Sequence, residues 1–192
     1  MPPKFKFTKE EMIATAFKLV RAKGWPALST RSLADALGTS ARPIYSHFKS
    51  MDQLEAEVAQ KGVDLLYEYM IRERTGDPWH DHGIGYVKFA QEESCLFRGL
   101  NDEKHITYFK AYGEIIWNTL TESLSDYPPF RGLSGEQIHH IQLTRWLMAH
   151  GLAFQVANHP PEVWNGKITP TMQQGSIAIL EGLKRQFLLQ GG

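Results

Sequence analysis

The stretch TRSLADALGTSARPIYSHFK, residues 30–49, decides the fold. Leu33 and Leu37 are four residues apart and therefore share one face of a predicted helix. Gly38 follows the last apolar residue, where a chain leaving a helix often needs a left-handed conformation. Ser40 is a good N-cap for a second helix. Two short helices joined by a glycine turn predict a helix-turn-helix, whose second helix would lie in a DNA major groove.

The second predicted helix has its own apolar pair, Ile44 and Phe48, which leaves its polar residues for another surface. An ordinary helical hairpin inside a core would show the same spacing, so the flanking sequence decides between the two. An amphipathic helix precedes the stretch, and Thr8 with Glu11 forms a capping box at its start. A second capping box, in the segment 50–53, begins a long helix after it. Three helices followed by a long fourth favour the DNA-binding interpretation.

Residues 8–58, about a quarter of the chain, resemble the DNA-binding domain of the tetracycline-repressor (TetR) family of bacterial regulators. The matching residues end the first helix, open the second, and form the turn, the recognition helix and the start of the fourth helix. They are Ala22 to Trp25, Leu28 to Arg31, Leu33, Ala34, Leu37, Gly38, Ser40, Ile44, Tyr45, His47, Phe48, Ser50 and Leu54. Met51 stands where the family usually has a basic residue, and Pro43 where it more often has Thr or another small residue. The remainder of the chain shows no comparable motif.

The predicted fold class is all-α, because no strand pattern appears anywhere in the 192 residues. We expect a helix-turn-helix DNA-binding domain over residues 1–50 and a larger helical regulatory and dimerisation domain over residues 51–192. In the larger domain, the apolar spacing predicts helices over 51–74, 79–93, 101–125, 134–158 and 170–189, with a short helical stretch over 94–101. Thr169 followed by Pro170 is a start signal for the last of these helices. Gly62, inside the first of them, indicates a bend or a close packing contact.

Charge is unevenly distributed along this formally neutral chain. Residues 1–50 hold nine Lys and Arg against three acidic residues, a net charge of +6, and residues 51–192 carry the balancing −6. This asymmetry fits a domain that meets phosphate joined to one that does not, although a chance fluctuation is the alternative. Cys95 is the single cysteine, and no stretch has the length of a signal peptide or a membrane span. We therefore expect a cytoplasmic protein.

Double-stranded DNA is the predicted partner of the first domain. Arg42 is the candidate for a bidentate contact to guanine, and Ala41 and Pro43 could touch thymine methyl groups. The resemblance implies phosphate contacts by Tyr45 and His47 and makes other polar residues candidates. The full predicted set is Thr30, Arg31, Ser40, Ala41, Arg42, Pro43, Tyr45, Ser46, His47 and Lys49.

The resemblance also implies a small-molecule effector bound in the larger domain. Aromatic residues with a few polar groups suit a mostly apolar ligand. The candidates are Cys95, Phe97, Tyr108, Tyr112, Trp117, Trp146, His150 and Phe154. Aromatic residues at helical spacing are more often simply core, so this alternative stays open for each of them.

A homodimer is predicted through the last two helices, about 134–158 and 170–189, packed against their copies as a four-helix bundle. Gly175 and Gly182 are seven residues apart on the last helix, where a second backbone could approach. A wholly intramolecular core is the alternative. A palindromic operator would follow from a symmetric dimer.

Other functions are less well supported. No enzyme motif is present: the sequence lacks GxSxG, a P-loop, GxGxxG and HExxH, so we expect neither catalysis nor a cofactor. The histidines at 80, 82, 139, 140 and 150 invite a metal-sensing regulator as an alternative function. Only Glu136 with His140, and Asp102 with His105, have helical ligand spacing, and each pair supplies just two ligands. A helical interaction module that does not bind DNA would leave the basic first domain unexplained.

Overall fold

The computed structural model describes the backbone of residues 7–102 and 104–190, and the side chains of these residues except 108–112 and 190. Within these ranges every regular element is a helix and no strand is present, as the sequence predicts. The chain divides into two compact units by contact. The first unit runs as far as Leu65 and also takes in Glu93–Gly113, and the second contains Leu66–Glu92 and the chain from Glu114 onward. The domain boundary at residue 50 stays a prediction about function, whereas these units follow packing.

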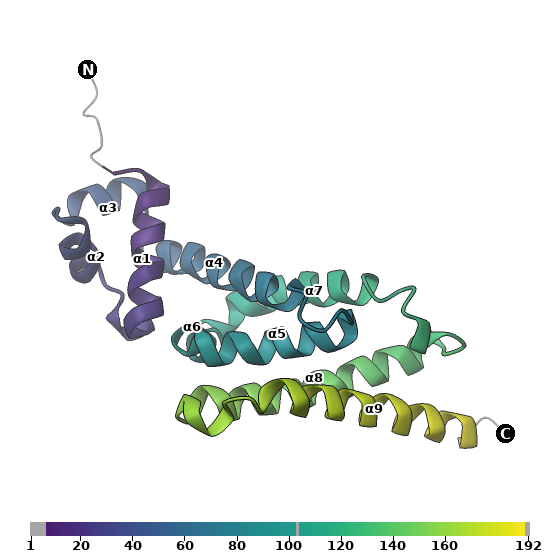
Figure 1. Cartoon of the computed structure of the whole chain (residues 1–192). Helices are drawn as coiled ribbons and strands as arrows, with labels where there is room; N and C mark the ends of the chain where they lie inside the picture. Colours follow the sequence, from purple (N-terminus) through teal and green to yellow (C-terminus); the bar gives the residue numbers. More distant parts are fainter. Residues whose placement is uncertain (1–6, 103, 191–192) are drawn as a thin grey trace. The chain divides into compact units, whose positions relative to one another are not determined.

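The first unit consists of the helix-turn-helix and the helices that support it (Figure 1). Its elements are α1 (Lys9–Lys23), η1 (Trp25–Ala27), α2 (Thr30–Leu37), α3 (Arg42–His47), most of α4 (Met51–Ile71), α6 (Ser94–Leu100) and the beginning of α7 (Ile106–Glu122).

Local sequence signals set most of the helix ends in this unit. Thr8 and Glu11 form the predicted capping box at the start of α1, and Ser29 caps α2 through the backbone amide of Ser32. Gly38 adopts the left-handed conformation (φ 63°, ψ 41°) that the turn requires. The prediction that Ser40 caps the next helix is wrong. Ala41 occupies the N-cap position of α3 with a helical backbone and no side-chain cap, because the turn enters the helix one residue later than expected.

The core of the first unit lies where α1, α2, α3 and α4 meet. Its fully buried side chains include Met12, Leu33, Ile44, Phe48, Leu54 and Val58. Trp25, in η1, is also buried. Its indole ring lies against the backbone of Gly99 in α6 and its centroid is 4.0 Å from that of His105. The tryptophan therefore joins the end of α1 to α6 and to the residues that precede α7.

The second unit is a bundle of long helices (Figure 1). Its elements are the end of α4, α5 (Pro78–Glu92), the larger part of α7, η2 (Pro128–Phe130), α8 (Gly135–Asn158), η3 (Pro161–Trp164) and α9 (Ile168–Gln190). Helix α5 packs against both α8 and α9, which also pack against each other. α5 is buried along most of its length, so it is the central helix of this unit.

The predicted helices of the second unit are present, with shifted ends. α4 stops at Ile71, three residues before the predicted end, and α7 begins at Ile106 because Asp102 accepts a hydrogen bond from the His105 amide just before it. Ser134 caps α8 as predicted. Thr169 is not the N-cap of α9. The helix begins at Ile168, so Thr169 and Pro170 lie in its first turn, where a missing amide proton is tolerated.

Substituting Gly99 tests the contact between Trp25 and α6. A Cβ atom at Gly99 would lie 1.6 Å from Cδ1 of Trp25, so we expect Gly99→Ala to lower the free energy of unfolding by about 1–3 kcal/mol, the usual cost of overpacking. Gly62→Ala is the matched control, because its Cβ would meet Leu100 at an ordinary 3.5 Å and helix propensity would favour alanine by about 1 kcal/mol. Urea unfolding measures both; equal stability of the two variants would contradict the contact.

Candidate nucleic-acid interface

Helices α2 and α3 pack together through apolar side chains and leave a polar surface on their outer side. Leu33 in α2 and Ile44 in α3 are fully buried, and Phe48 anchors the end of α3. The left-handed turn at Gly38 reverses the chain between the two helices. The opposite side of α3 therefore points outward, and Arg42, Tyr45 and Ser46 all lie on it, exposed.

A hydrogen bond between the two helices orients one of these exposed residues. The hydroxyl groups of Thr30 and Tyr45 are 2.9 Å apart, and either can be the donor. Thr30 is the first residue of α2, and Tyr45 lies in α3 with 54 % of its surface exposed. Both residues are predicted DNA contacts, but their hydrogen bond could not be read from the sequence, because it depends on how the turn sets the two helices. It holds the phenol of Tyr45 over the start of α2.

The other predicted DNA contacts lie on the same two helices and on the segments that follow them. Arg31, Ser40 and Lys49 are exposed, whereas Ala41, Pro43 and His47 are half-buried. Arg31 is 3.9 Å from Asp35, at the limit of an ion pair, and both side chains are largely exposed, so the pairing is weak. Ser46 donates its hydroxyl proton to the Pro43 carbonyl. The predicted residues therefore lie on the partly or fully exposed side of the helix-turn-helix.

Ion pairs inside the first unit join α1 to α4 and to Glu93, just before α6. Lys9 in α1 pairs with Glu57 in α4. Arg21, near the end of α1, donates two hydrogen bonds to Glu93, one of them at 2.8 Å between Nε and Oε2. Because Glu93 is largely buried, this fork is better shielded from solvent than a surface pair. Sequence reasoning missed both pairs, since their partners are 48 and 72 residues apart.

A buried histidine lies at the junction of η1, α4 and the start of α7. His105 is 4 % exposed, with Nδ1 2.7 Å from an Asp102 oxygen and Nε2 3.4 Å from an oxygen of Glu55. Its ring also contacts Trp25. The predicted Asp102–His105 spacing therefore brings the two side chains together, within a hydrogen-bonded structural joint.

In the second unit, three of the predicted ligand residues form one cluster. His150 stacks on Trp146 with ring centroids 5.1 Å apart and lies 6.0 Å from Phe154, one turn away along α8. The hydroxyl of Tyr86 in α5 is 2.8 Å from His150 Nδ1. Burial lowers the pKa of His150 and raises the pKa of Tyr86. A neutral imidazole and a phenol among aromatic rings could bind a flat, mostly apolar molecule. Tyr86 was missed because its phenol gives no sequence signal of its own.

The remaining predicted ligand residues do not join this cluster among the described contacts. Trp117 makes an edge-to-face contact with His139, at 5.9 Å between centroids. Cys95 and Phe97 lie in α6, in the first unit, where Phe97 is buried. The side chains of Tyr108 and Tyr112 lie outside the described residues.

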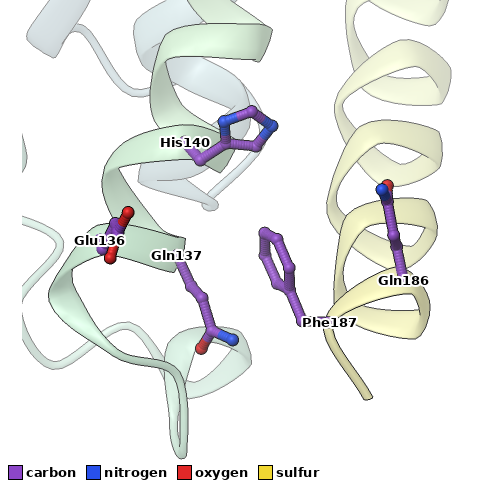
Figure 2. A pocket seen from close by; sticks show the side chains of 5 residues that line it. All are labelled: Glu136, Gln137, His140, Gln186 and Phe187. Carbon is purple, nitrogen blue, oxygen red and sulfur yellow. The ribbon is translucent and has the colours of Figure 1, made fainter. Parts of the chain in front are cut away.

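His140, near the start of α8, lines a surface cavity. Glu136, Gln137 and His140 face Gln186 and Phe187 of α9 around a volume of about 360 Å³ (Figure 2). The rings of His140 and Phe187 are 6.1 Å apart at their centroids. In the described part of the chain, no group of three His, Cys, Asp or Glu side chains could hold a metal ion. None of the helices described has both the length and the apolar character needed to cross a membrane.

Comparisons with known proteins match part of the chain to one family. Residues 12–58 match the family described as "Bacterial regulatory proteins, tetR family". The chain is 29 % identical over 93 residues, 48 % of its length, to the tetracycline repressor protein class C of Escherichia coli. This match spans only 39 % of that relative's own length.

Solved structures share the fold over nearly the whole chain. A transcriptional regulator from Rhodococcus sp. Rha1 has a TM-score of 0.63 at 16 % identity, covering 92 % of this chain and 97 % of that one. The TetR family transcriptional regulator PfmR from Thermus thermophilus has a TM-score of 0.53 at 16 % identity, covering 88 % of this chain and 97 % of that one.

Removing one hydroxyl tests the link between α2 and α3. We expect Tyr45→Phe to weaken DNA binding by about 0.5–1.5 kcal/mol, because the ring keeps its packing but loses its hydrogen bond to Thr30 and any bond to phosphate. Fluorescence anisotropy with a labelled duplex measures the change. Tyr67→Phe, on α4 and distant in sequence from the helix-turn-helix, is the control. Equal affinities of the wild type and Tyr45→Phe would contradict the role given to this hydroxyl.

Proposed function

We propose that the chain is a bacterial transcriptional regulator of the TetR family, a repressor that binds a palindromic operator as a homodimer and is released by a small effector. A single observation carries the DNA-binding part. Arg31, Arg42 and Lys49 are exposed around the helix-turn-helix of a segment whose net charge is +6. Phosphate neutralisation by such residues supplies the affinity that does not depend on sequence.

Specificity for the base sequence of the operator would come from residues at the start of α3. Arg42 is its first residue and is exposed, so its guanidinium can reach the edge of a guanine at N7 and O6. Ala41 and Pro43 flank it with small apolar surfaces, suited to thymine methyl groups. Tyr45, His47, Lys49, Thr30 and Arg31 would hold phosphates and set the register of the helix in the groove.

Selection of binding sites from a random duplex pool tests the proposed operator. A symmetric dimer predicts an enriched inverted repeat, with half-site centres one helical turn or a multiple apart. Enrichment of a single unrepeated site would contradict the dimeric mode, and no enrichment at all would contradict specific DNA binding.

Arg42→Ala tests the base contact. On the selected duplex we expect a loss of about 1–3 kcal/mol and relaxed preference at one base position in each half-site. Lys61→Ala removes an exposed positive charge from α4, away from the helix-turn-helix, and should change binding little. Equal losses by Arg42→Ala on specific and random DNA would assign Arg42 to phosphate and contradict base reading.

The proposed dimer surface lies on α8 and α9. Leu143, Leu147 and Phe154 are exposed large apolar side chains on one face of α8, and Gly151 lies between the last two at matching spacing. On α9, Ile177 is 51 % exposed, and among the described residues a Cβ at Gly182 would meet nothing within 4 Å outside the backbone of its own helix. Gly175 differs, because the Met148 side chain of the same chain already occupies the space beside it. Exposed apolar residues in a stripe, with open backbone nearby, fit a second copy of the same two helices.

Leu147→Glu tests this surface. Leu147 is 57 % exposed in the single chain, so a carboxylate there costs the monomer little but would be buried unpaired in the dimer. We expect at least a tenfold weaker dimer by analytical ultracentrifugation, with the helical circular dichroism unchanged. Ile115→Glu is the control, because Ile115 is 60 % exposed on α7. A Leu147→Glu protein that dimerises like the wild type would exclude this surface.

Release by an effector would act through a population shift. A ligand that prefers the conformation unable to bind DNA lowers DNA affinity by its differential affinity for the two conformations. The cluster of Tyr86, Trp146, His150 and Phe154 supports an effector site in the second unit, because it combines aromatic surface with two polar groups.

A further inference from the structure

A buried arginine lies in the second unit, outside the helix-turn-helix. Arg145 of α8 is 7 % exposed, and its guanidinium carbon lies 4.0 Å from the centre of the Trp79 ring. Its Nη1 donates a hydrogen bond to the Trp79 carbonyl. Burial lowers the pKa of Arg145 to about 10, so the side chain still carries its positive charge at neutral pH.

This charge lacks an anionic partner within the described part of the chain. No carboxylate there is within ion-pair distance of Arg145, and its buried Nε makes no hydrogen bond. Burial is the largest influence on the Arg145 pKa and lowers it, whereas Tyr127 and then Asp77 raise it. Asp77 is the carboxylate among these groups. Its oxygens already accept hydrogen bonds from the Trp79 amide and the Tyr127 hydroxyl. A buried charge with an unsatisfied donor is costly, so such groups are normally paired or used by a ligand.

Two more buried polar groups without hydrogen-bond partners in the described part of the chain occur on the helices that face Arg145. They are Nδ1 of His82 in α5, a residue 4 % exposed, and Oγ of Ser176 in α9, a residue with no exposed surface. Burial, followed by the charge of Arg145, lowers the pKa of His82 to about 4, so this histidine is neutral at neutral pH. Three unsatisfied polar groups therefore come from three helices that pack on one another.

Gly83 shows how closely these helices meet. A Cβ atom there would lie 2.6 Å from Cε of Met172 and 3.5 Å from Nη1 of Arg145. Ser176 is one helical turn after Met172 on α9, and His82 adjoins Gly83 on α5. The absence of a side chain at position 83 lets Met172 of α9 and Arg145 of α8 pack closely against α5.

A surface cavity leads to the same end of α5. It has a volume of about 330 Å³ and is lined by Ile71, Glu73, Gly76, Pro78, Asp81 and His82. Burial raises the pKa of Asp81, but hydrogen bonds from the Arg74 amide and from Thr75 outweigh this and lower it. The Asp81 carboxylate is thus already satisfied by Arg74 and Thr75. His82 is the residue common to this cavity and to the polar groups around Arg145.

We propose that Arg145, with Ser176 and His82, binds the carboxylate of a small organic acid that acts as the effector. The Nε edge of a guanidinium offers two parallel N–H donors, which match the two oxygens of a carboxylate. The Ser176 hydroxyl adds a third donor, and the neutral imidazole adds no competing charge. This proposal deepens the proposed function and rests on it, because it names the chemical class of the effector.

Three acids and their amides test the charge requirement. Sodium benzoate, phenylacetate and hexanoate are each compared with the corresponding primary amide, using the full-length protein. Thermal shift measures binding without DNA, and anisotropy measures release from the selected duplex. We expect at least one acid to bind at least tenfold more tightly than its amide and to weaken DNA binding. If no acid is preferred over its amide, the proposal is wrong.

Variants separate a ligand site from a structural arginine. Arg145→Met removes an unpaired buried charge at similar volume, so we expect an equal or higher melting temperature without ligand and at least tenfold weaker acid binding. Ser176→Ala should keep the fold and also weaken acid binding, whereas Arg131→Met, at an exposed arginine of the same unit, should change neither. A marked drop in the melting temperature of Arg145→Met, with Ser176→Ala binding the acid like the wild type, would make Arg145 structural and overturn the proposal. Failure of the proposed function itself would differ, because the wild-type protein would then bind no DNA at any acid concentration.

Discussion

The packing of α3 on α2 through Leu33, Ile44 and Phe48 is the constraint on which the proposed function depends. These side chains can be buried together only if the chain reverses at Gly38, which needs a left-handed residue. When the apolar side of α3 packs on α2, the polar side of α3 is left facing solvent. The hydrogen bond between Thr30 and Tyr45 then forms across the exposed edge of these two helices. Apolar burial thus determines where the predicted DNA-contact residues lie, although none of those residues contributes to the core.

Local signals made this part of the fold predictable. Glycine at 38, the capping boxes and the apolar pairs four residues apart each act within a few residues, and the helices they predict are present. The errors at Ser40 and Thr169 were shifts of one or two positions, as expected where neighbouring residues compete for a cap. Long-range pairs could not be predicted. Arg21 forms its hydrogen bonds with Glu93, and Tyr86 forms its hydrogen bond with His150, only because segments distant in sequence pack together.

The buried polar groups of the two units differ in their surroundings. In the first unit, His105 lies between the carboxylates of Asp102 and Glu55 and contacts the ring of Trp25. In the second unit, Arg145, His82 and Ser176 are buried with unmet hydrogen-bonding capacity. Paired polar groups of this kind stiffen the support of the helix-turn-helix. Buried polar groups with unmet hydrogen-bonding capacity are expected where a ligand completes them, and sites that bind ligands often sacrifice stability in this way.

The salt dependence of binding to the selected duplex tests the central claim most directly, because it counts the phosphates that the protein neutralises. Arg31 and Lys49 in each half of a dimer would make four cationic phosphate contacts. The logarithm of the binding constant should then fall linearly against the logarithm of salt concentration, with a slope of about −3 to −4. A slope of this size or steeper is the predicted result. Binding that is indifferent to salt would contradict the assignment of this basic helix-turn-helix to DNA.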